Sequence, residues 1–276
     1  MTAVRFYLSG RENEDHVIKS LYEGCPETKQ LVEGFEYEPS DVAVVFGVYK
    51  SQVPVSFPRG RVIGKQKARN LTNLILETGY IKRGSAKTNY YAAGLNGING
   101  RADFRNEGMP DDRSRKIDVP LRPWWGNGEK VLLCGQVPWD ASVDHHNHLR
   151  WLVEAATVLQ SLTKRTIVFR PHPLAKLPNL TGCELSDGRP IEEELREAHV
   201  VVTFNSNCGV DAILNGVPVY AFDQGSMVYR IANKNWMMLE HPKMPERQQW
   251  FNDICYCQWM PDEMANGETW KHLFRK

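Results

Sequence analysis

Short continuous runs of apolar residues alternate along the chain with stretches in which apolar residues recur every three or four positions. The clearest run lies at 41–48 (DVAVVFGV) and is typical of a strand buried on both faces. The first half predicts three further strands, at 4–8, 60–64 and 74–77, and two helices, at 15–22 and 27–33. The first half is therefore expected to alternate between strands and helices.

The second half alternates more regularly. It predicts strands at 130–134, 166–170, 199–204 and 217–222, and helices at 148–162, 191–198 and 209–214. One apolar face of the longest helix is formed by Leu149, Leu152, Val153, Ala156 and Leu159. This order predicts a parallel sheet with helices on both faces, and such sheets bind ligands at the carboxyl ends of their strands.

Residues 84–128 interrupt the alternation. They are rich in Gly, Asn, Arg, Asp and Pro and show little periodicity, which predicts a long loop region that connects two lobes. The predicted domains are an N-terminal lobe at 1–128, a C-terminal lobe at 129–235 and a segment at 236–276 that packs back on the N-terminal lobe.

The net charge of +1 conceals an uneven distribution. Residues 1–49 hold four Lys or Arg against nine Asp or Glu, residues 50–130 hold sixteen against seven, and residues 131–276 hold fourteen against seventeen. The middle block is strongly basic, which indicates an anionic partner unless acidic neighbours in the fold balance it.

Composition and motifs disfavour several classes of protein. No stretch approaches the ~20 apolar residues of a membrane span, and the N-terminal residues do not resemble a secretory signal, so we expect a cytoplasmic protein. The six cysteines are scattered without a C-x-x-C pair, which predicts free thiols and no metal site. No G-x-x-x-x-G-K-[ST] or G-x-G-x-x-G motif is present, which argues against an ATPase or a dinucleotide oxidoreductase.

Two polar segments directly follow predicted strands. In the first, Asp140 stands beside Gln136 and Ser142, where it would act as a base or nucleophile or would cap a turn. In the second, two prolines flank His172 and stiffen the loop that follows Arg170. A cation and an imidazole suit a phosphate, although a rigid turn would explain the same residues.

A third polar segment, 203–212, opens a predicted helix. Backbone amides near Ser206 and Asn207 suit an anion, and Asp211 lies one turn inside the helix, where it would reach ribose hydroxyls. Plain helix capping by Ser206 or Asn207 is the alternative. The three segments together indicate a site for a nucleotide sugar.

Four segments occur in the order LETGYIKRG (76–84), LLCGQVPWDAS (132–142), FRPHP (169–173) and TFNSNCGVDAILNGVPVYAF (203–222). The set resembles the capsule polysaccharide biosynthesis family of Kdo transferases, whose pattern is E-D-G-F-[IL]-R-S, G-Q-V-x-x-D-A-S, [RK]-P-H-P and T-S-x-x-G-F-E-A-L-L-x-G-x-x-V. The resemblance spans residues 76–229. It implies an α/β, two-lobed GT-B-like glycosyltransferase with Rossmann-like lobes, which uses a nucleotide sugar without a metal or another cofactor.

The resemblance also implies roles for single residues. Asp140 matches the catalytic carboxylate, and Glu77 matches the acidic residue near the acceptor. Thr78 stands where the family has a second acidic residue, so the family's donor sugar is not carried over. The expected donor-binding residues are Gln136, Ser142, Arg170, His172, Ser206, Asn207 and Asp211, with Tyr229 matching an aromatic residue after the last strand.

Two acceptors remain open. Residues 90–112 are similar to segments of small phage-encoded proteins of this type, which implies a hydroxymethylated base in phage DNA, modified in the host cytoplasm. The basic block would then follow the phosphates of double-stranded DNA, and the base would be flipped out. The expected acceptor-binding residues are Lys65, Lys67, Arg69, Lys82, Arg83, Asn99 and Arg101. The other acceptor is a glycan or lipid-linked saccharide, and a non-catalytic nucleotide-sugar-binding module is a further alternative.

Overall fold

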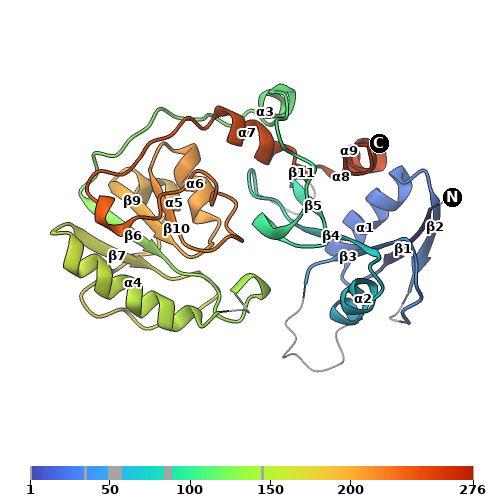
Figure 1. Ribbon diagram of the computed structural model, residues 1–276, viewed down its shortest axis with the longest axis horizontal. Helices are drawn as coiled ribbons and strands as arrows, with labels where there is room; N and C mark the ends of the chain where they lie inside the picture. Colours follow the sequence, from blue (N-terminus) through green and yellow to red (C-terminus); the bar gives the residue numbers. More distant parts are fainter. Residues whose placement is uncertain (1, 34–35, 49–57, 84–88, 144–145, 276) are drawn as a thin grey trace. The chain divides into compact units, whose positions relative to one another are not determined.

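The computed structural model describes residues 2–33, 36–48, 58–83, 89–143 and 146–275. The chain divides into two compact units, each built around its own sheet (Figure 1). Unit 1 comprises Met1–Ile117 and Asn252–Lys276, and unit 2 comprises Asp118–Phe251. The sequence predicts domain boundaries after residues 128 and 235. In the structure, 118–128 and 236–251 instead belong to unit 2, and 252–276 belong to unit 1.

In the described part of unit 1, six strands form one sheet in the order β11-β5-β4-β3-β1-β2. The strands are β1 (Ala3–Tyr7), β2 (Thr28–Val32), β3 (Val42–Phe46), β4 (Thr72–Thr78), β5 (Tyr91–Leu95) and β11 (Gln258–Trp259). Strands β1 to β4 are parallel, and β5 is antiparallel to both of its neighbours. The strand order reverses at β1, which has β2 on one side and β3 on the other.

Helices cover both faces of this sheet (Figure 1). The elements are α1 (Glu12–Gly24), α2 (Pro58–Lys67), η1 (Asn99–Arg101), α3 (Asp112–Ile117), α8 (Pro261–Ala265) and α9 (Glu268–Leu273). Phe6, Ile18 and Trp270 lie in the core on the face of α1, α8 and α9. Val62 and Ile75 lie in the core beneath α2, on the opposite face.

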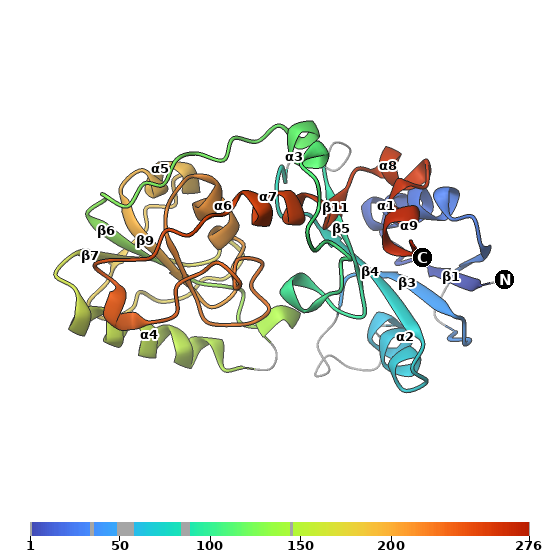
Figure 2. The same ribbon diagram turned by 45° about the horizontal axis from the view of Figure 1, so that its top comes forward.

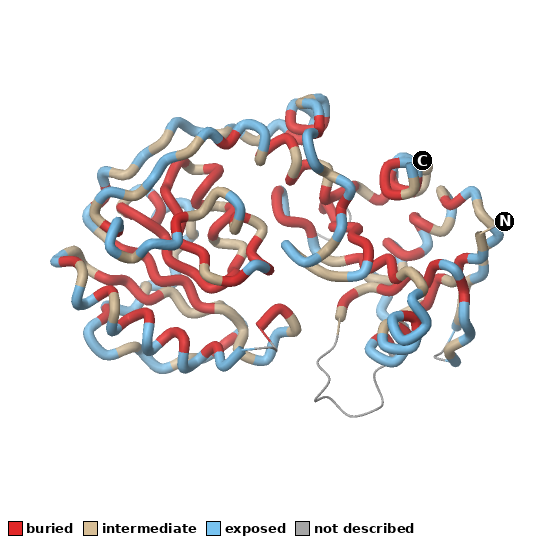
Figure 3. The backbone as a smooth tube through the Cα atoms, in the orientation of Figure 1, coloured by how far each residue is buried: buried red, intermediate tan, exposed pale blue. Residues whose placement is uncertain are grey.

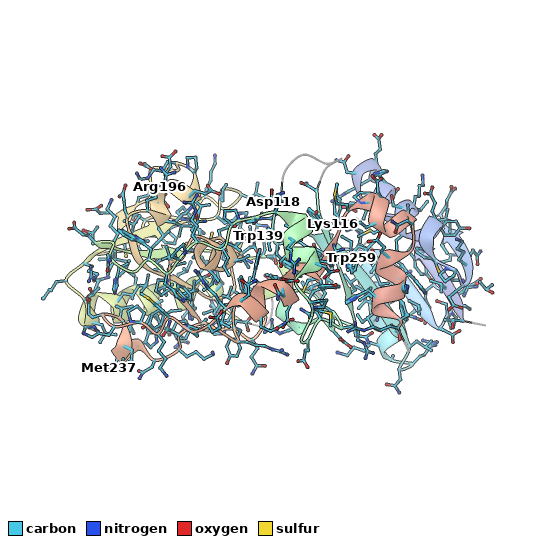
Figure 4. The ribbon with its side chains drawn as sticks, turned by 90° about the horizontal axis from the view of Figure 1, so that it is seen from above. Lys116, Asp118, Trp139, Arg196, Met237 and Trp259 are labelled. Atoms are coloured by element: carbon cyan, nitrogen blue, oxygen red, sulfur yellow. The ribbon has the colours of Figure 1, made fainter. Side chains whose placement is uncertain are left out.

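A buried ion pair joins α3 to the C-terminal segment of unit 1. Arg113 donates to Glu263 from Nη1 and Nη2, both at 3.1 Å, and both side chains are 5% exposed. The guanidinium also lies 3.8 Å from the ring centre of Trp259 on β11. Lys116 contacts the same carboxylate at 2.6 Å; Figure 4 labels Lys116 and Trp259. The last strand of unit 1 is thereby tied to residues far earlier in the chain.

Among the described residues of unit 2, five parallel strands have the order β10-β9-β6-β7-β8. The strands are β6 (Lys130–Cys134), β7 (Thr166–Arg170), β8 (Glu184–Leu185), β9 (Ala198–Thr203) and β10 (Val219–Ala221). The other elements are η2 (Ala141–Val143), α4 (His148–Leu162), α5 (Ile191–Leu195), α6 (Cys208–Leu214), η3 (Trp236–Met238) and α7 (Gln248–Cys255), which crosses into unit 1. Helix α4 covers one face of the sheet, and α5 and α6 cover the other (Figures 1 and 2). The strand order reverses between β6 and β9.

The predicted fold class, an α/β GT-B-like protein with two Rossmann-like lobes, is confirmed. The strands of both sheets are mainly buried, as expected for sheets covered on both faces (Figure 3). Strands β6 and β7 and helix α4 have the bounds that the sequence predicts. The apolar face predicted for α4 is wrong at Leu149 and Val153, which are 48% and 56% exposed. The buried stripe keeps the predicted Leu152, Ala156 and Leu159 and adds His148, Trp151 and Ala155.

Three predictions in the first half are wrong. Residues 27–33 form strand β2, not a helix; β2 is an edge strand without a fully buried residue, so its sequence carries no strand period. Residues 60–64 lie in helix α2, where Arg59, Val62 and Gln66 form one buried stripe. The predicted loop 84–128 contains β5 and α3 in its described part. Among the described residues, no helix is long and apolar enough to cross a membrane.

Candidate functional site

The reversal of strand order between β6 and β9 marks the carboxyl edge of unit 2 as a ligand-binding edge, because the loops that leave adjacent strands diverge there. The loop after β6 carries Gln136, Asp140 and Ser142, and the loop after β9 carries Asn205 and Ser206. These residues come from segments far apart in sequence, and hydrogen bonds connect them.

The loop after β6 presents Asp140 at the surface. Its Oδ1 accepts a hydrogen bond from the Ser142 backbone N–H at 2.8 Å, and Gln136 Nε2 donates to Ser142 Oγ at 3.0 Å. Asp140 therefore caps the turn η2, as the structural alternative in the sequence analysis proposed. The cap fixes one carboxylate oxygen, and the exposed side chain has a second oxygen to turn toward a ligand. Trp139, labelled in Figure 4, is 61% exposed and offers a flat apolar face beside this carboxylate.

The loop after β9 is locked to the loop after β6 by Asn205. Its Nδ2 donates to the Ser142 backbone oxygen at 2.9 Å and to Asp223 Oδ2 at 2.8 Å. Asp223 follows β10 and is 6% exposed, and its Oδ2 also accepts from the Gly225 N–H. Sequence reasoning missed both Asn205 and Asp223. The one sequence signal for these two residues is that each directly follows a strand. Their contact with the loop after β6 depends on the strand order β10-β9-β6, which the sequence does not reveal.

His148, the first residue of α4, also takes part in this hydrogen-bond network. Its Nε2 accepts the backbone N–H of Gln136 at 2.9 Å, and its ring stacks on Trp151 with centroids 5.8 Å apart. Burial, with a smaller contribution from His146, lowers the pKa of His148 to about 4. The ring is therefore neutral at pH 7 and carries its proton on Nδ1. Sequence reasoning also missed this residue, which fixes the start of the Asp140 loop.

In the segment after β9, the polar groups hydrogen-bond mainly to one another, whereas the sequence predicts that they bind an anion. The Ser206 N–H donates to Thr203 Oγ1 at 3.0 Å, and Ser206 Oγ accepts from the Cys208 N–H at 3.4 Å. The N–H groups of Gly209 and Val210 bond to carbonyls within the same turn. The amides at the opening of α6 are therefore engaged within the loop, so Ser206 would meet a donor mainly through its hydroxyl. Asn207 precedes α6, and the half-buried Asp211 lies in the first turn of this helix.

Arg170 and His172 leave β7 in different environments. Arg170 Nη1 donates to Glu194 Oε2 at 2.9 Å and to the Arg189 backbone oxygen at 2.8 Å, and Glu194 is 6% exposed. This ion pair fixes α5 to the sheet and engages the nitrogen that was expected to meet a phosphate. His172 Nδ1 accepts from the Leu174 N–H at 3.2 Å, and the imidazole is half-exposed. The loop after β7 is thus a turn held by a hydrogen bond, and it also leaves the imidazole half-exposed, so both alternatives of the sequence analysis stay open.

The carboxyl edge of the unit 1 sheet gathers charged side chains. Arg59 of α2 pairs with Glu14 of α1 at 2.5 Å, and the two side chains are 10% and 15% exposed. Gly47, directly after β3, has φ of 77°. A Cβ at Gly47 would lie 2.9 Å from Arg59 Nη1 and 3.7 Å from Glu77 Oε1. Glu77, at the end of β4, therefore lies beside the buried ion pair.

The cations at the C-terminal end of α2 form one exposed group. Lys65, Lys67 and Arg69 are all exposed, and the charged ends of Lys65 and Arg69 lie 5.3 and 5.4 Å from the ring centre of Tyr37. Helix α2 leads into β4, so this group stands at the amino end of β4.

The other expected acceptor-binding residues divide between two edges of the unit 1 sheet. Asn99 and Arg101 form η1 after β5, and because β5 is antiparallel to β4, this turn also stands at the amino end of β4. Lys82 and Arg83 follow the opposite, carboxyl end of β4. The seven residues therefore do not form one surface within unit 1.

Among the described residues, no group of three or more His, Cys, Asp or Glu side chains is arranged to hold a metal ion.

No protein-family model and no curated protein matches the chain. The solved structures that share its fold include two transferases. The beta Kdo 2,4 transferase of Thermosulfurimonas dismutans KpsC has a TM-score of 0.57 at 14% identity over 87% of this chain and 89% of its own. The beta Kdo 2,7 transferase of the same protein has a TM-score of 0.56 at 13% identity over 93% and 89%. At these coverages each likeness includes residues of both units, so the chain shares the fold of these transferases.

Proposed function

We propose that the protein is a glycosyltransferase that moves a sugar from a nucleotide-sugar donor to a hydroxyl acceptor. The observation that carries this proposal is the hydrogen-bonded edge of unit 2, where Gln136, Ser142 and Asn205 hold two loops together beside the exposed carboxylate of Asp140. Open α/β sheets bind ligands at such an edge. The likeness of the fold to two Kdo transferases supports the same reading.

The donor lies along the loops that follow β6, β7 and β9. His172 and the Ser206 hydroxyl meet the phosphate, and Asp211 reaches the ribose from the first turn of α6. Arg170 contributes its charge from behind, because its Nη1 is held by Glu194. These groups stabilise the negative charge that develops on the departing nucleotide.

Asp140 is the proposed catalytic carboxylate. Its cap to the Ser142 N–H keeps the carboxylate oriented, so that Oδ2 turns toward the sugar or the acceptor. As a base it would deprotonate the acceptor hydroxyl and give inversion at the anomeric carbon. As a nucleophile it would form a glycosyl intermediate and give retention.

The acceptor is proposed to be a saccharide hydroxyl bound at the carboxyl edge of unit 1. Glu77 there is a hydrogen-bond acceptor for hydroxyl groups, and the neighbouring Glu14 and Arg59 are paired with each other. A hydroxymethylated base in DNA is the second candidate. The exposed cations of α2, Lys65, Lys67 and Arg69, are the observation that favours it.

One assay tests the donor and the acceptor together. The protein is incubated with a panel of nucleotide sugars and one of three acceptors: an oligosaccharide mixture, hydroxymethylcytosine DNA or unmodified DNA. A sugar-sized mass gain on the saccharide, lost in Asp140→Asn and kept in the surface control Asp187→Asn, is the expected result. A gain confined to the modified DNA transfers the proposal to the second acceptor, and binding to that DNA should then weaken steeply with salt. If the protein neither transfers nor hydrolyses the sugar of any donor, the glycosyltransferase proposal is overturned.

A further inference from the structure

Two of the eight tryptophans have exposed side chains, and one of these stands beside the proposed catalytic carboxylate. Trp139 is 61% exposed and directly precedes Asp140, whereas Trp125 is 44% exposed. The other six are buried or have contacts for their rings or indole nitrogens: Trp124, Trp151, Trp236, Trp250, Trp259 and Trp270. In the part of the chain that the structure describes, the Trp139 indole has no hydrogen bond and no aromatic or cationic neighbour. Its ring is therefore open to a ligand.

The two exposed tryptophans lie at opposite ends of the unit 2 sheet. Trp139 lies in the loop after β6, at the carboxyl edge. Trp125 precedes β6, and its backbone N–H donates to the oxygen of Gly216, which precedes β10. Because all described strands of this sheet are parallel, Trp125 lies at the amino edge. Ligands of such sheets bind at the carboxyl edge, so only Trp139 is placed to meet one.

The backbone that carries Trp139 is held in place. The Asp140 N–H donates to the Val137 oxygen at 3.0 Å, which closes the turn around the tryptophan. Pro138 restricts the backbone directly before it. Asn205 ties the same loop to the loop after β9. A ligand that covers the indole therefore does not have to order this loop, and the loss of entropy on binding is smaller.

The charge around Trp139 indicates which class of ligand it suits. Indoles stack on nucleobases, and their negative faces also attract the C–H groups of a pyranose ring. Proteins that stack bases of a nucleic acid add cations that follow its phosphates. The segment 135–147 contains two aspartates and no lysine or arginine. Its hydrogen-bond partners from other segments include the neutral side chains of Asn205 and His148. These neighbours favour a saccharide over a polyanion.

We propose that Trp139 is the stacking platform for a pyranose ring of a saccharide acceptor and places the accepting hydroxyl at Asp140. This inference rests on the proposed function and names the class of its acceptor. The nucleotide donor binds through its phosphate charge, whereas a saccharide hydroxyl lacks such a charge. The indole instead supplies apolar contact area directly beside the reacting carboxylate.

The first experiment needs no transferase activity. The full chain is labelled with fluorotryptophan, and its fluorine NMR spectrum is recorded; Trp139→Phe and Trp125→Phe identify the signals of the two exposed tryptophans. The methyl glycosides of glucose, galactose, mannose and N-acetylglucosamine are titrated separately, as is hydroxymethyldeoxycytidine. We expect at least one glycoside to shift the Trp139 signal, while the Trp125 signal stays in place. The nucleoside should shift neither.

Two results of this titration would overturn the saccharide platform. One is a Trp139 signal that no glycoside shifts up to saturation of the solution. The other is a Trp139 signal that only hydroxymethyldeoxycytidine shifts, which would assign the indole to a nucleobase. A shift of the Trp125 signal equal to that of Trp139 would also contradict the proposal, because it would show general binding of sugars to exposed indoles.

Transfer kinetics test the same platform through variants of one residue. Trp139→Leu keeps an apolar side chain and removes the aromatic face, so KM for the saccharide should rise about tenfold, with a smaller change in kcat and an unchanged KM for the donor. Trp139→Phe keeps an aromatic face and should recover most of the loss. Trp125→Leu is the matched control and should behave as wild type. Because the Trp139 side chain is exposed, denaturant unfolding of Trp139→Leu should have the wild-type midpoint.

The kinetic outcomes separate the platform from the proposed function. Transfer by the wild type with an unchanged KM for the saccharide in Trp139→Leu would refute the platform and leave the glycosyltransferase in place. Equal losses in Trp139→Leu and Trp139→Phe would refute stacking. Absence of transfer by the wild type with every donor would count against the proposed function, and the fluorine signals would still report whether Trp139 binds a saccharide.

Discussion

Each unit has a sheet whose strand order reverses, mixed in unit 1 and parallel in unit 2, and the edges at the two reversals have different chemistry. In unit 2 a mostly neutral network through Ser142 and Asn205 presents one exposed carboxylate, Asp140. In unit 1 the corresponding edge holds a half-buried carboxylate, Glu77, beside the buried pair of Glu14 and Arg59. The residues placed at each edge, rather than the sheet itself, therefore decide what that edge can bind.

The units also differ in how their chains are assembled. Unit 2 is continuous from 118 to 251, whereas unit 1 is completed by 252–276, which supply β11, α8 and α9. Unit 1 relies on the pair of Arg113 and Glu263 to hold this late segment, and the described ion pairs of unit 2 include no comparably buried contact with a distant segment. Loss of this pair should therefore destabilise unit 1.

The largest expected effect is at the exposed carboxylate of unit 2. Asp140→Asn removes the negative charge and keeps the amide oxygen that can accept from the Ser142 N–H. Transfer should fall by about 10⁴-fold, while the dissociation constant of the donor changes little. Rate measurements and calorimetric binding test the two parts. An equal loss of binding and rate would make Asp140 a structural residue, and the contrast between the units would fail.

The second effect is on the stability of unit 1. Arg113→Met leaves Glu263 buried and removes the bonds that Arg113 donates to the Cys255 and Gln258 backbone oxygens. The free energy of unfolding should fall by about 4 kcal/mol, as for other broken buried pairs. Arg115→Met is the matched control, because this exposed arginine of the same helix pairs only with exposed Asp111 among the described residues, so denaturant unfolding should not detect its loss. Similar midpoints for the two variants would contradict the role of the buried pair.

The third effect is the pH dependence of unit 2. The pKa of His148 is about 4 in the folded protein and 6.5 when unperturbed, so the unfolded chain binds the extra proton between these values. The contribution of His148 to the free energy of unfolding is constant above pH 6.5 and falls by on the order of 3 kcal/mol as pH drops to 4. Denaturant unfolding at pH 7.5 and 4.5 measures it, with His148→Gln as the variant that cannot titrate. Equal pH slopes for the two proteins would refute this assignment.

The smallest effect distinguishes strain from crowding at the unit 1 edge. Gly47 and Gly10 have φ of 77° and 78°, but an added Cβ meets Arg59 at Gly47 and nothing within 4 Å at Gly10. Both alanine variants should lose about 1 kcal/mol from the left-handed backbone, and Gly47→Ala should lose about 1 kcal/mol more. Thermal unfolding of the two variants side by side provides the measurement. Identical losses would mean that Arg59 yields without cost.

The sequence predicts an element well where that element is buried, because buried elements have clear apolar patterns. Four strands of unit 2 are largely buried and its long helix has a buried stripe, so their apolar patterns are strong and their bounds were predicted closely, whereas the exposed two-residue strand β8 was not predicted. In unit 1, strand β2 has no fully buried residue and α2 has only a narrow buried stripe, so local pattern gave the wrong element for both. Strand β11 has two residues, and its place beside β5 depends on a contact across most of the chain.

The site was predictable to the extent that it is local. Asp140, Gln136 and Ser142 lie in one loop, and the structure brings them together. Asn205 and Asp223 join them only because β9 lies between β6 and β10, which no local pattern specifies. The bond between Arg170 and Glu194 likewise joins the end of β7 to a residue of α5 that lies 24 residues further along the chain, and it was not predicted.

The division of unit 1 into two chain segments affects its folding during translation. A ribosome releases residues in order, so the whole of unit 2 emerges before the residues that finish unit 1. Until then the nascent chain contains an unpaired edge at β5, because β11 has not been synthesised, and a guanidinium at Arg113 without its carboxylate. Open strand edges attract other chains. Newly made protein should therefore be most vulnerable to aggregation in the interval between completion of unit 2 and arrival of the final 25 residues, Asn252–Lys276.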